Sequence, residues 1–77
     1  MAQTYTREQI TDQLELLQQR IDQPGNGGGF MGTNKNNLRK QYRYYIYLLR
    51  RLGNNDSVAF PDTVINEAKA ASGNPSF

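Results

Sequence analysis

Apolar residues in the first third of the chain repeat with the period of an amphipathic helix. They are spaced four, three and four residues apart: Ile10, Leu14, Leu17 and Ile21. This spacing places them on one stripe of an α-helix. Thr6 and Gln9 fit a capping box at its start, and Pro24 disfavours helix at the residue before it. The pattern therefore predicts a helix over residues 7–22.

A second apolar stripe follows in the middle of the chain. Its members are spaced four, three, four and three apart: Leu38, Tyr42, Tyr45, Leu49 and Leu52. Asn36 or Asn37 can cap the start of this helix, and Gly53 suits the left-handed position after its end. Other apolar residues widen the stripe at both edges, which indicates more than one packed neighbour. We predict a helix over residues 37–52, antiparallel to the first.

The segment between the two helices, residues 24–36, is rich in glycine and asparagine, a composition that argues against a regular element. Within it lies the apolar pair Phe30 and Met31, which we expect to dock into a pocket on this chain or another. Residues 27–32 also satisfy the nucleotide-binding pattern G-x-G-x-x-G. A helix precedes them instead of the strand that this pattern requires, so a linker is favoured.

The last third of the chain predicts one more helix. Residues 58–60 are a short apolar segment, a proline follows, and a thin apolar face continues over residues 62–71. A helix this short needs docking to be stable in water, and an extended tail ending at Phe77 comes after it. We therefore predict an all-α fold, with a helical hairpin over residues 1–53 and a C-terminal docking arm over residues 54–77.

Composition narrows the available chemistry. The 77 residues include no cysteine, histidine or tryptophan, which excludes disulfides and zinc sites built from Cys or His. Only 36% of the residues are hydrophobic, so one small domain of this kind gains stability from a partner. No run is long enough to span a membrane, and the start lacks the features of a secretory signal. We expect a protein of the cytoplasm or of a virion, with no cofactor, metal, small-molecule substrate or membrane partner.

The net charge of +2 conceals an uneven distribution. Residues 23–55 carry six basic residues and no acidic one, whereas acidic residues outnumber basic ones in both flanks. The flanks can neutralise the middle of the chain, either within one molecule or between copies. Alternatively, the basic middle can face a polyanion.

The outer face of the first helix is acidic. Glu8, Asp12 and Glu15 are four and three residues apart, a spacing that could serve a divalent cation or an acid–base pair. Such a row is more often a solvated helix face, so we expect no enzymatic activity. Leu16 lies off the apolar stripe and could mark a second contact face.

The second helix carries basic and aromatic residues on the half opposite its apolar stripe. Arginine and tyrosine are enriched at protein interfaces, and they also neutralise phosphates and stack on bases. We expect a protein interface, with nucleic-acid binding and packing within the chain as the alternatives. The predicted partner-binding residues, together with apolar anchors elsewhere in the chain, are Phe30, Met31, Arg39, Arg43, Tyr44, Tyr47, Leu48, Arg50, Arg51, Phe60 and Phe77.

Three segments set the layout of the chain: the capped first helix from Thr6 to Ile21, the basic second helix from Leu38 to Leu52, and the tail from Val58 to Phe77. This layout resembles small virion proteins of tailed bacteriophages, of the head–tail joining or head-completion kind. The resemblance implies a non-enzymatic structural protein that bridges larger subunits, such as a connector, neck or cement component, and that binds copies of itself. The alternatives are a small nucleic-acid-binding protein that uses the second helix, and a small regulator that inhibits a host enzyme.

Overall fold

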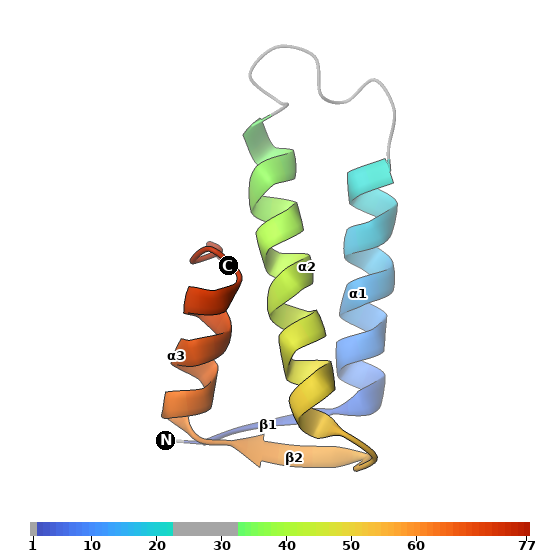
Figure 1. Cartoon of the computed structure of the whole chain (residues 1–77). Coiled ribbons are helices and arrows are strands. Elements are labelled where there is room, and N and C mark those ends of the chain that lie inside the picture. The colour runs from blue at the N-terminus through green and yellow to red at the C-terminus, as the bar shows by residue number, and fades with distance from the viewer. Residues whose placement is uncertain (1, 23–32) are drawn as a thin grey trace.

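The computed structural model of the chain describes residues 2–22 and 33–77, without the side chains of residues 33 and 34. Five elements follow one another in this order: β1 (Gln3–Thr6), α1 (Arg7–Asp22), α2 (Thr33–Leu52), β2 (Ser57–Phe60) and α3 (Asp62–Ala71). The helices lie side by side, with α2 between α1 and α3, and the two strands cross beneath their ends (Figure 1). The middle helix is therefore packed on two sides, as its wide apolar surface indicates.

The predicted all-α class is wrong, because β1 and β2 form an antiparallel sheet of two strands. Gln3 pairs with Phe60 at one end of the ladder, and Thr6 pairs with Ser57 at the other. Both strands contain aromatic and β-branched residues, which suit a half-buried pleated surface. Each strand is only four residues long, so neither one shows a period of two clearly enough to be recognised alone.

The sheet joins the C-terminal third of the chain to its N-terminus. Phe60 of β2, and Ile65 and Ala68 of α3, belong to the same buried cluster as the residues of the first two helices. Residues 57–71, predicted as part of a docking arm, therefore pack on this chain's own hairpin. This packing provides the partner surface that a helix as short as α3 requires.

The start of α1 has the reciprocal bonds of a capping box. The backbone N–H of Thr6 donates to Oε1 of Gln9 over 2.9 Å, and the backbone N–H of Gln9 donates to Oγ1 of Thr6 over 3.1 Å. These bonds satisfy two amide groups that the helix itself cannot pair. Thr6 is also the last residue of β1, so the same residue ends the strand and begins the helix.

The Thr6→Ala variant is expected to lose about 1 kcal/mol of free energy of unfolding, the usual cost of removing a threonine cap. Urea unfolding followed by circular dichroism measures this loss. Thr63→Ala is the matched control, because Thr63 is exposed in the first turn of α3 and makes no side-chain hydrogen bond within the described residues. Equal midpoints for Thr6→Ala and the wild type would show that the capping box contributes nothing.

The helix α2 begins at Thr33, earlier than the predicted residue 37. Asn37 does not cap it, because its side chain bonds the tail of the chain. Its Nδ2 donates to the carbonyl oxygen of Ser76 over 2.9 Å, and the backbone N–H of Ser76 donates to its Oδ1 over 2.8 Å. Gln41 also donates to the Ser76 carbonyl. The Asn37 side chain, which the sequence predicted as a helix cap, thus binds the C-terminal tail at Ser76.

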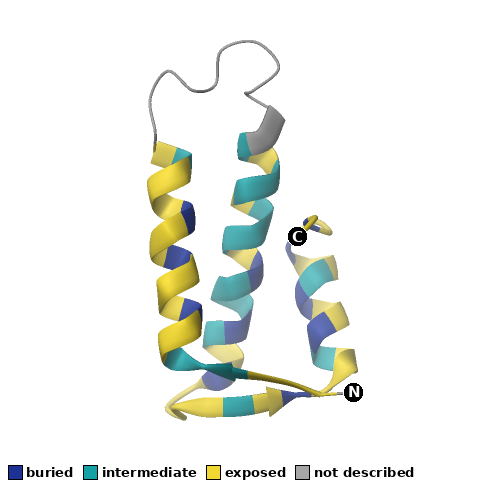
Figure 2. Cartoon of the chain, turned by 180° about the vertical axis from the view of Figure 1, so that it is seen from behind, coloured by how far each residue is buried: buried dark blue, intermediate teal, exposed yellow. Residues whose placement is uncertain are grey.

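The core is centred on a different line of α2 from the one predicted. Of the predicted stripe, Leu52 is buried, whereas Tyr42, Tyr45 and Leu49 are only partly buried against the cluster. The other buried positions are Tyr44 and Leu48. The sequence indicated more than one neighbour for this helix, but it did not show where the second one packs; α3 is that neighbour, and the centre of burial is shifted toward it. On α1 the buried positions are the predicted Ile10, Leu14 and Leu17. Figure 2 shows this face of α1 turned toward α2, with its exposed face on the outside.

Candidate functional site

Two basic residues of α2, Arg43 and Arg50, line an open groove between α2 and α3. We call it the basic groove; it has a volume of about 430 Å³ and is lined by Tyr42, Arg43, Ile46, Tyr47 and Arg50 of α2 and by Ala71 of α3. Arg43 and Arg50 are exposed, while the tyrosines and Ile46 are half-buried. The groove thus combines an apolar floor with a charged rim, the arrangement that protein interfaces commonly show.

Three arginines run along this face of α2. Arg39, Arg43 and Arg50, which we call the arginine stripe, are four and seven residues apart, so they share one side of the helix. At 1.5 Å of rise per residue, they extend over roughly 16 Å. All three are exposed, and none forms a hydrogen bond or an ion pair within residues 2–22 and 33–77. Their guanidinium groups are therefore available for bidentate contacts to carboxylates or phosphates.

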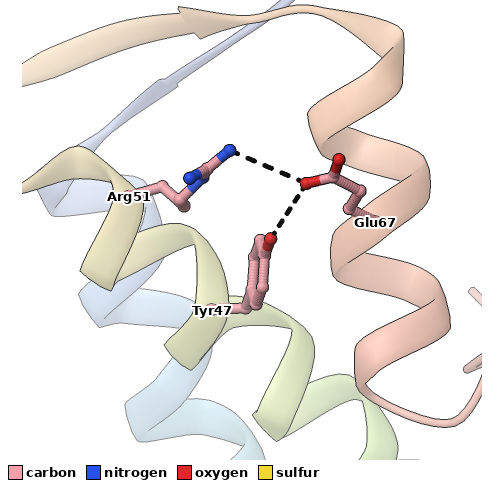
Figure 3. A network of polar contacts seen from close by, with 3 residues as sticks. All are labelled: Tyr47, Arg51 and Glu67. Carbon is pink, nitrogen blue, oxygen red and sulfur yellow. Dashed lines mark hydrogen bonds and ion pairs between the residues drawn. The ribbon is translucent and has the colours of Figure 1, made fainter.

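Arg51, also predicted to bind a partner, interacts with residues of this chain instead. Figure 3 shows Arg51 and Tyr47 of α2 converging on Glu67 of α3. Nη2 of Arg51 lies 3.6 Å from Oε2 of Glu67, and the Tyr47 hydroxyl donates to the same oxygen over 3.2 Å. The Arg51 guanidinium also lies 5.8 Å from the centre of the Tyr47 ring. This network joins the two helices beside the groove and occupies both the hydroxyl and one face of Tyr47.

Three of the predicted anchors are corrected by their burial. Tyr44, Leu48 and Phe60 are 2%, 0% and 3% exposed, so they contribute to this chain's core and offer no surface to a partner. The sequence placed Tyr44 on the basic half of the helix and Leu48 at the edge of the apolar stripe, but both lie in the core cluster with residues of α1, β2 and α3. Burial raises the pKa of the Tyr44 phenol, and a hydrogen bond to Tyr5 raises it further.

Phe77 remains a candidate anchor, because it is exposed, unlike Tyr44, Leu48 and Phe60. Its ring lies 4.9 Å from that of Tyr44 and 6.2 Å from that of Tyr45, both in edge-to-face geometry, yet the residue is 66% exposed. It covers the core on one side and presents apolar surface on the other. Phe30 and Met31, and the G-x-G-x-x-G pattern around them, lie outside the described residues.

Sequence reasoning missed three residues of the groove: Tyr42, Ile46 and Ala71. Ala71 was assigned to the thin apolar face of the last helix. Tyr42 was assigned to the core, and Ile46 to the edge of the apolar stripe. Ile46 lies three residues after Arg43 and four before Arg50, so it shares their helix face. Its position within the arginine stripe was the available signal for an apolar floor.

A second hollow, of about 550 Å³, lies where β1 meets α1, but its arginine is not free. Arg7 donates from Nη2 to the carbonyl oxygens of Gly53, over 2.7 Å, and Asn55, over 3.0 Å. These bonds satisfy carbonyls in the turn that follows α2, where Gly53 has the positive φ of 62° expected of a helix-ending glycine. Arg7 therefore holds the start of α1 to the turn after α2, and it is not an unpaired cation in this hollow.

The described residues show no other kind of site. Among residues 2–22 and 33–77, no group of three or more acidic side chains is arranged to hold a metal ion, so Glu8, Asp12 and Glu15 do not form the cation site that their spacing allowed. Within those ranges, no helix has the length and apolarity needed to cross a membrane. Comparison with known proteins finds no matching family model, no similar curated protein and no similar solved structure.

Proposed function

We propose that this chain is a small non-enzymatic assembly protein whose basic groove binds an acidic surface of a protein subunit. The observation that carries the proposal is the arginine stripe, which is exposed and has no partner among the described residues, beside the half-buried floor of Tyr42, Ile46 and Tyr47. Desolvated apolar contacts supply affinity at such a site, and bidentate arginine contacts at its rim supply orientation. The resemblance of the chain's layout to small phage virion proteins supports a role in bridging larger subunits.

Two features of the groove favour a protein over a nucleic acid. Stacking on bases needs aromatic rings with a free face. Tyr44 is buried, and Tyr47 is engaged by Arg51 and Glu67. In addition, Asp62 and Glu67 are exposed on α3, which forms one side of the groove, and they would repel an extended polyanion.

The test compares two probes for the groove. One is a helical peptide with glutamates four and seven residues apart, and the other is a DNA duplex of arbitrary sequence. Fluorescence anisotropy should show tighter binding of the peptide, weakened about tenfold by Arg43→Ala, as expected for an arginine at an interface. Arg20→Ala is the control, because it removes the same charge from an exposed position on α1.

Tighter binding of the duplex would overturn the proposal. A nucleic-acid-binding face would also show a salt slope that falls by about one unit for each lost phosphate contact, in Arg43→Ala but not in Arg20→Ala. Failure of the acidic peptide to bind at low salt would overturn the proposal as well.

A further inference from the structure

We propose that the acidic surface bound by the basic groove is the outer face of α1 in a second copy of this chain, so that copies join head to tail. This inference rests on the proposed function and names its partner. It follows from the arrangement of opposite charges on two faces of the same molecule.

The outer face of α1 carries a stripe of carboxylates. Glu8, Asp12, Glu15 and Asp22, which we call the acidic stripe, are four, three and seven residues apart, so they share one side of the helix. That side is opposite Ile10, Leu14 and Leu17, and it is exposed along its length (Figure 2). Asp22 accepts a hydrogen bond from Gln18, and the other three side chains make no hydrogen bond or ion pair within the described residues.

The acidic and arginine stripes do not neutralise each other within one chain. Across residues 2–22 and 33–77, the ion pair that involves an arginine of α2 is the one between Arg51 and Glu67 of α3. The acidic stripe is opposite the face of α1 that packs on α2, so its carboxylates are turned away from the arginines of the same molecule. Each stripe is therefore an unneutralised row of charge that a second copy can complement.

The two stripes also share one spacing. Glu8 and Glu15 are seven residues apart, as are Arg50 and Arg43. When the two helices run antiparallel, Glu8 lies opposite Arg50 and Glu15 lies opposite Arg43, about 10 Å apart along the axis in both helices. The antiparallel arrangement also places opposite ends of the helix dipoles together.

An apolar contact accompanies the charges. Leu16 follows Glu15 at the edge of the acidic stripe and is 41% exposed, one of two large apolar side chains left on the surface of the described residues. In this register Leu16 lies opposite Tyr42, which belongs to the half-buried apolar floor of the groove. Covering Leu16 with this floor removes apolar surface from water on both molecules.

This pairing joins two different surfaces, so each copy binds one neighbour through α1 and another through α2. An interface of this type forms a closed ring when its rotation closes, and an open chain when it does not. Because several contributing pairs are exposed to solvent, association should weaken steeply as salt rises and the Debye length falls below about 8 Å.

Sedimentation velocity of the full chain at low salt tests the inference. The wild type should form dimers and larger species that dissociate at high salt. Arg43→Glu alone and Glu15→Arg alone should each weaken association at least about tenfold, because like charges then face each other. The control, Arg20→Glu, reverses a charge off the acidic stripe and should associate more like the wild type.

Mixing the two variants gives the decisive result. Glu15→Arg retains an intact arginine stripe and Arg43→Glu retains an intact acidic stripe, so an equimolar mixture should recover association between the two proteins. Circular dichroism of each variant confirms that it is folded. The absence of recovery from folded variants, or equal association of all variants, would overturn the pairing.

The two proposals fail in distinguishable ways. A wild type that stays monomeric at low salt but binds the glutamate peptide would overturn head-to-tail pairing and leave the proposed function standing. A wild type that does neither would overturn both. Leu16→Ala should weaken association without altering the salt dependence, since it removes apolar contact and no charge.

Discussion

The Leu48→Ala variant is expected to lose about 2–5 kcal/mol of free energy of unfolding, the usual cost of emptying a core position. Leu48 is completely buried in the cluster that contains residues of all three helices and of β2. The cost combines the lost burial of its side chain with the cavity left behind, which a tightly packed interior fills only in part. A chain of this size has a total stability of about 4–12 kcal/mol, so this loss is a large fraction of it and should lower the unfolding midpoint strongly.

Urea unfolding followed by circular dichroism measures this effect, with Leu16→Ala as the matched control. Leu16 is the same residue type on α1, but it is 41% exposed, so its replacement should change stability by no more than about 0.5 kcal/mol. Similar midpoints for the two variants would contradict the placement of Leu48 at the centre of the core. A small effect of Leu48→Ala with a large effect of Leu16→Ala would reverse the assigned faces.

The helices could be predicted from the sequence because their signals are local. On α1 the apolar spacing, the Thr6–Gln9 capping box and Pro24 all lie within about twenty residues of one another, and the helix spans Arg7–Asp22 as predicted. A period repeated over about three turns is hard to produce by chance. The predicted helix over residues 62–71 likewise appears as α3.

The sheet and the position of the core on α2 could not be predicted in this way, because both depend on contacts between distant segments. Tyr5 pairs with Val58 across more than fifty residues, and nothing near either residue specifies the other. The same applies to α2, whose apolar residues cover more than one face. Which of those faces becomes the core depends on where α3 packs, and periodicity within α2 does not contain that information.

In the candidate site, the charged residues could be predicted from the sequence, but the packing of the apolar ones could not. Arg39, Arg43 and Arg50 could be identified from sequence because an uncompensated charge tends to stay in water, whichever elements surround it. Tyr44 and Leu48 were misassigned because an apolar residue can serve either a core or an interface. From the sequence, the acidic residues of the first helix could neutralise the basic residues of the second either within one chain or between copies. The fold favours the second, since it turns the acidic stripe away from the arginines of the same molecule.

Tyr44 should make the protein lose stability at alkaline pH. Its hydroxyl lies 3.1 Å from that of Tyr5, and its ring packs against Tyr45 and Phe77. Burial, followed by the hydrogen bond to Tyr5, raises the pKa of Tyr44 above the ordinary value of 10.0. Burial also raises the pKa of Tyr45.

A raised pKa in the folded protein means that the native state keeps a proton that the unfolded chain releases. Below pH 10 both states hold this proton, so the free energy of unfolding is unaffected. Above pH 10 the unfolded chain ionises first, and stability should fall by up to about 1.4 kcal/mol per pH unit for Tyr44. The fall continues until the pH reaches the pKa of the folded protein.

Tyr44→Phe separates this effect from the titration of other groups. The variant keeps the ring but has no proton to lose, so its alkaline decline should be shallower than that of the wild type, while its stability at neutral pH is lower by about 1 kcal/mol for the lost Tyr5 bond. Tyr42→Phe is the control, because Tyr42 lies in the groove and is only half-buried. The measurement is the urea midpoint between pH 8 and pH 12, with tyrosinate absorbance recorded on the folded protein. Parallel declines for the wild type and Tyr44→Phe would show that Tyr44 ionises without unfolding the chain, and would contradict its place in the core.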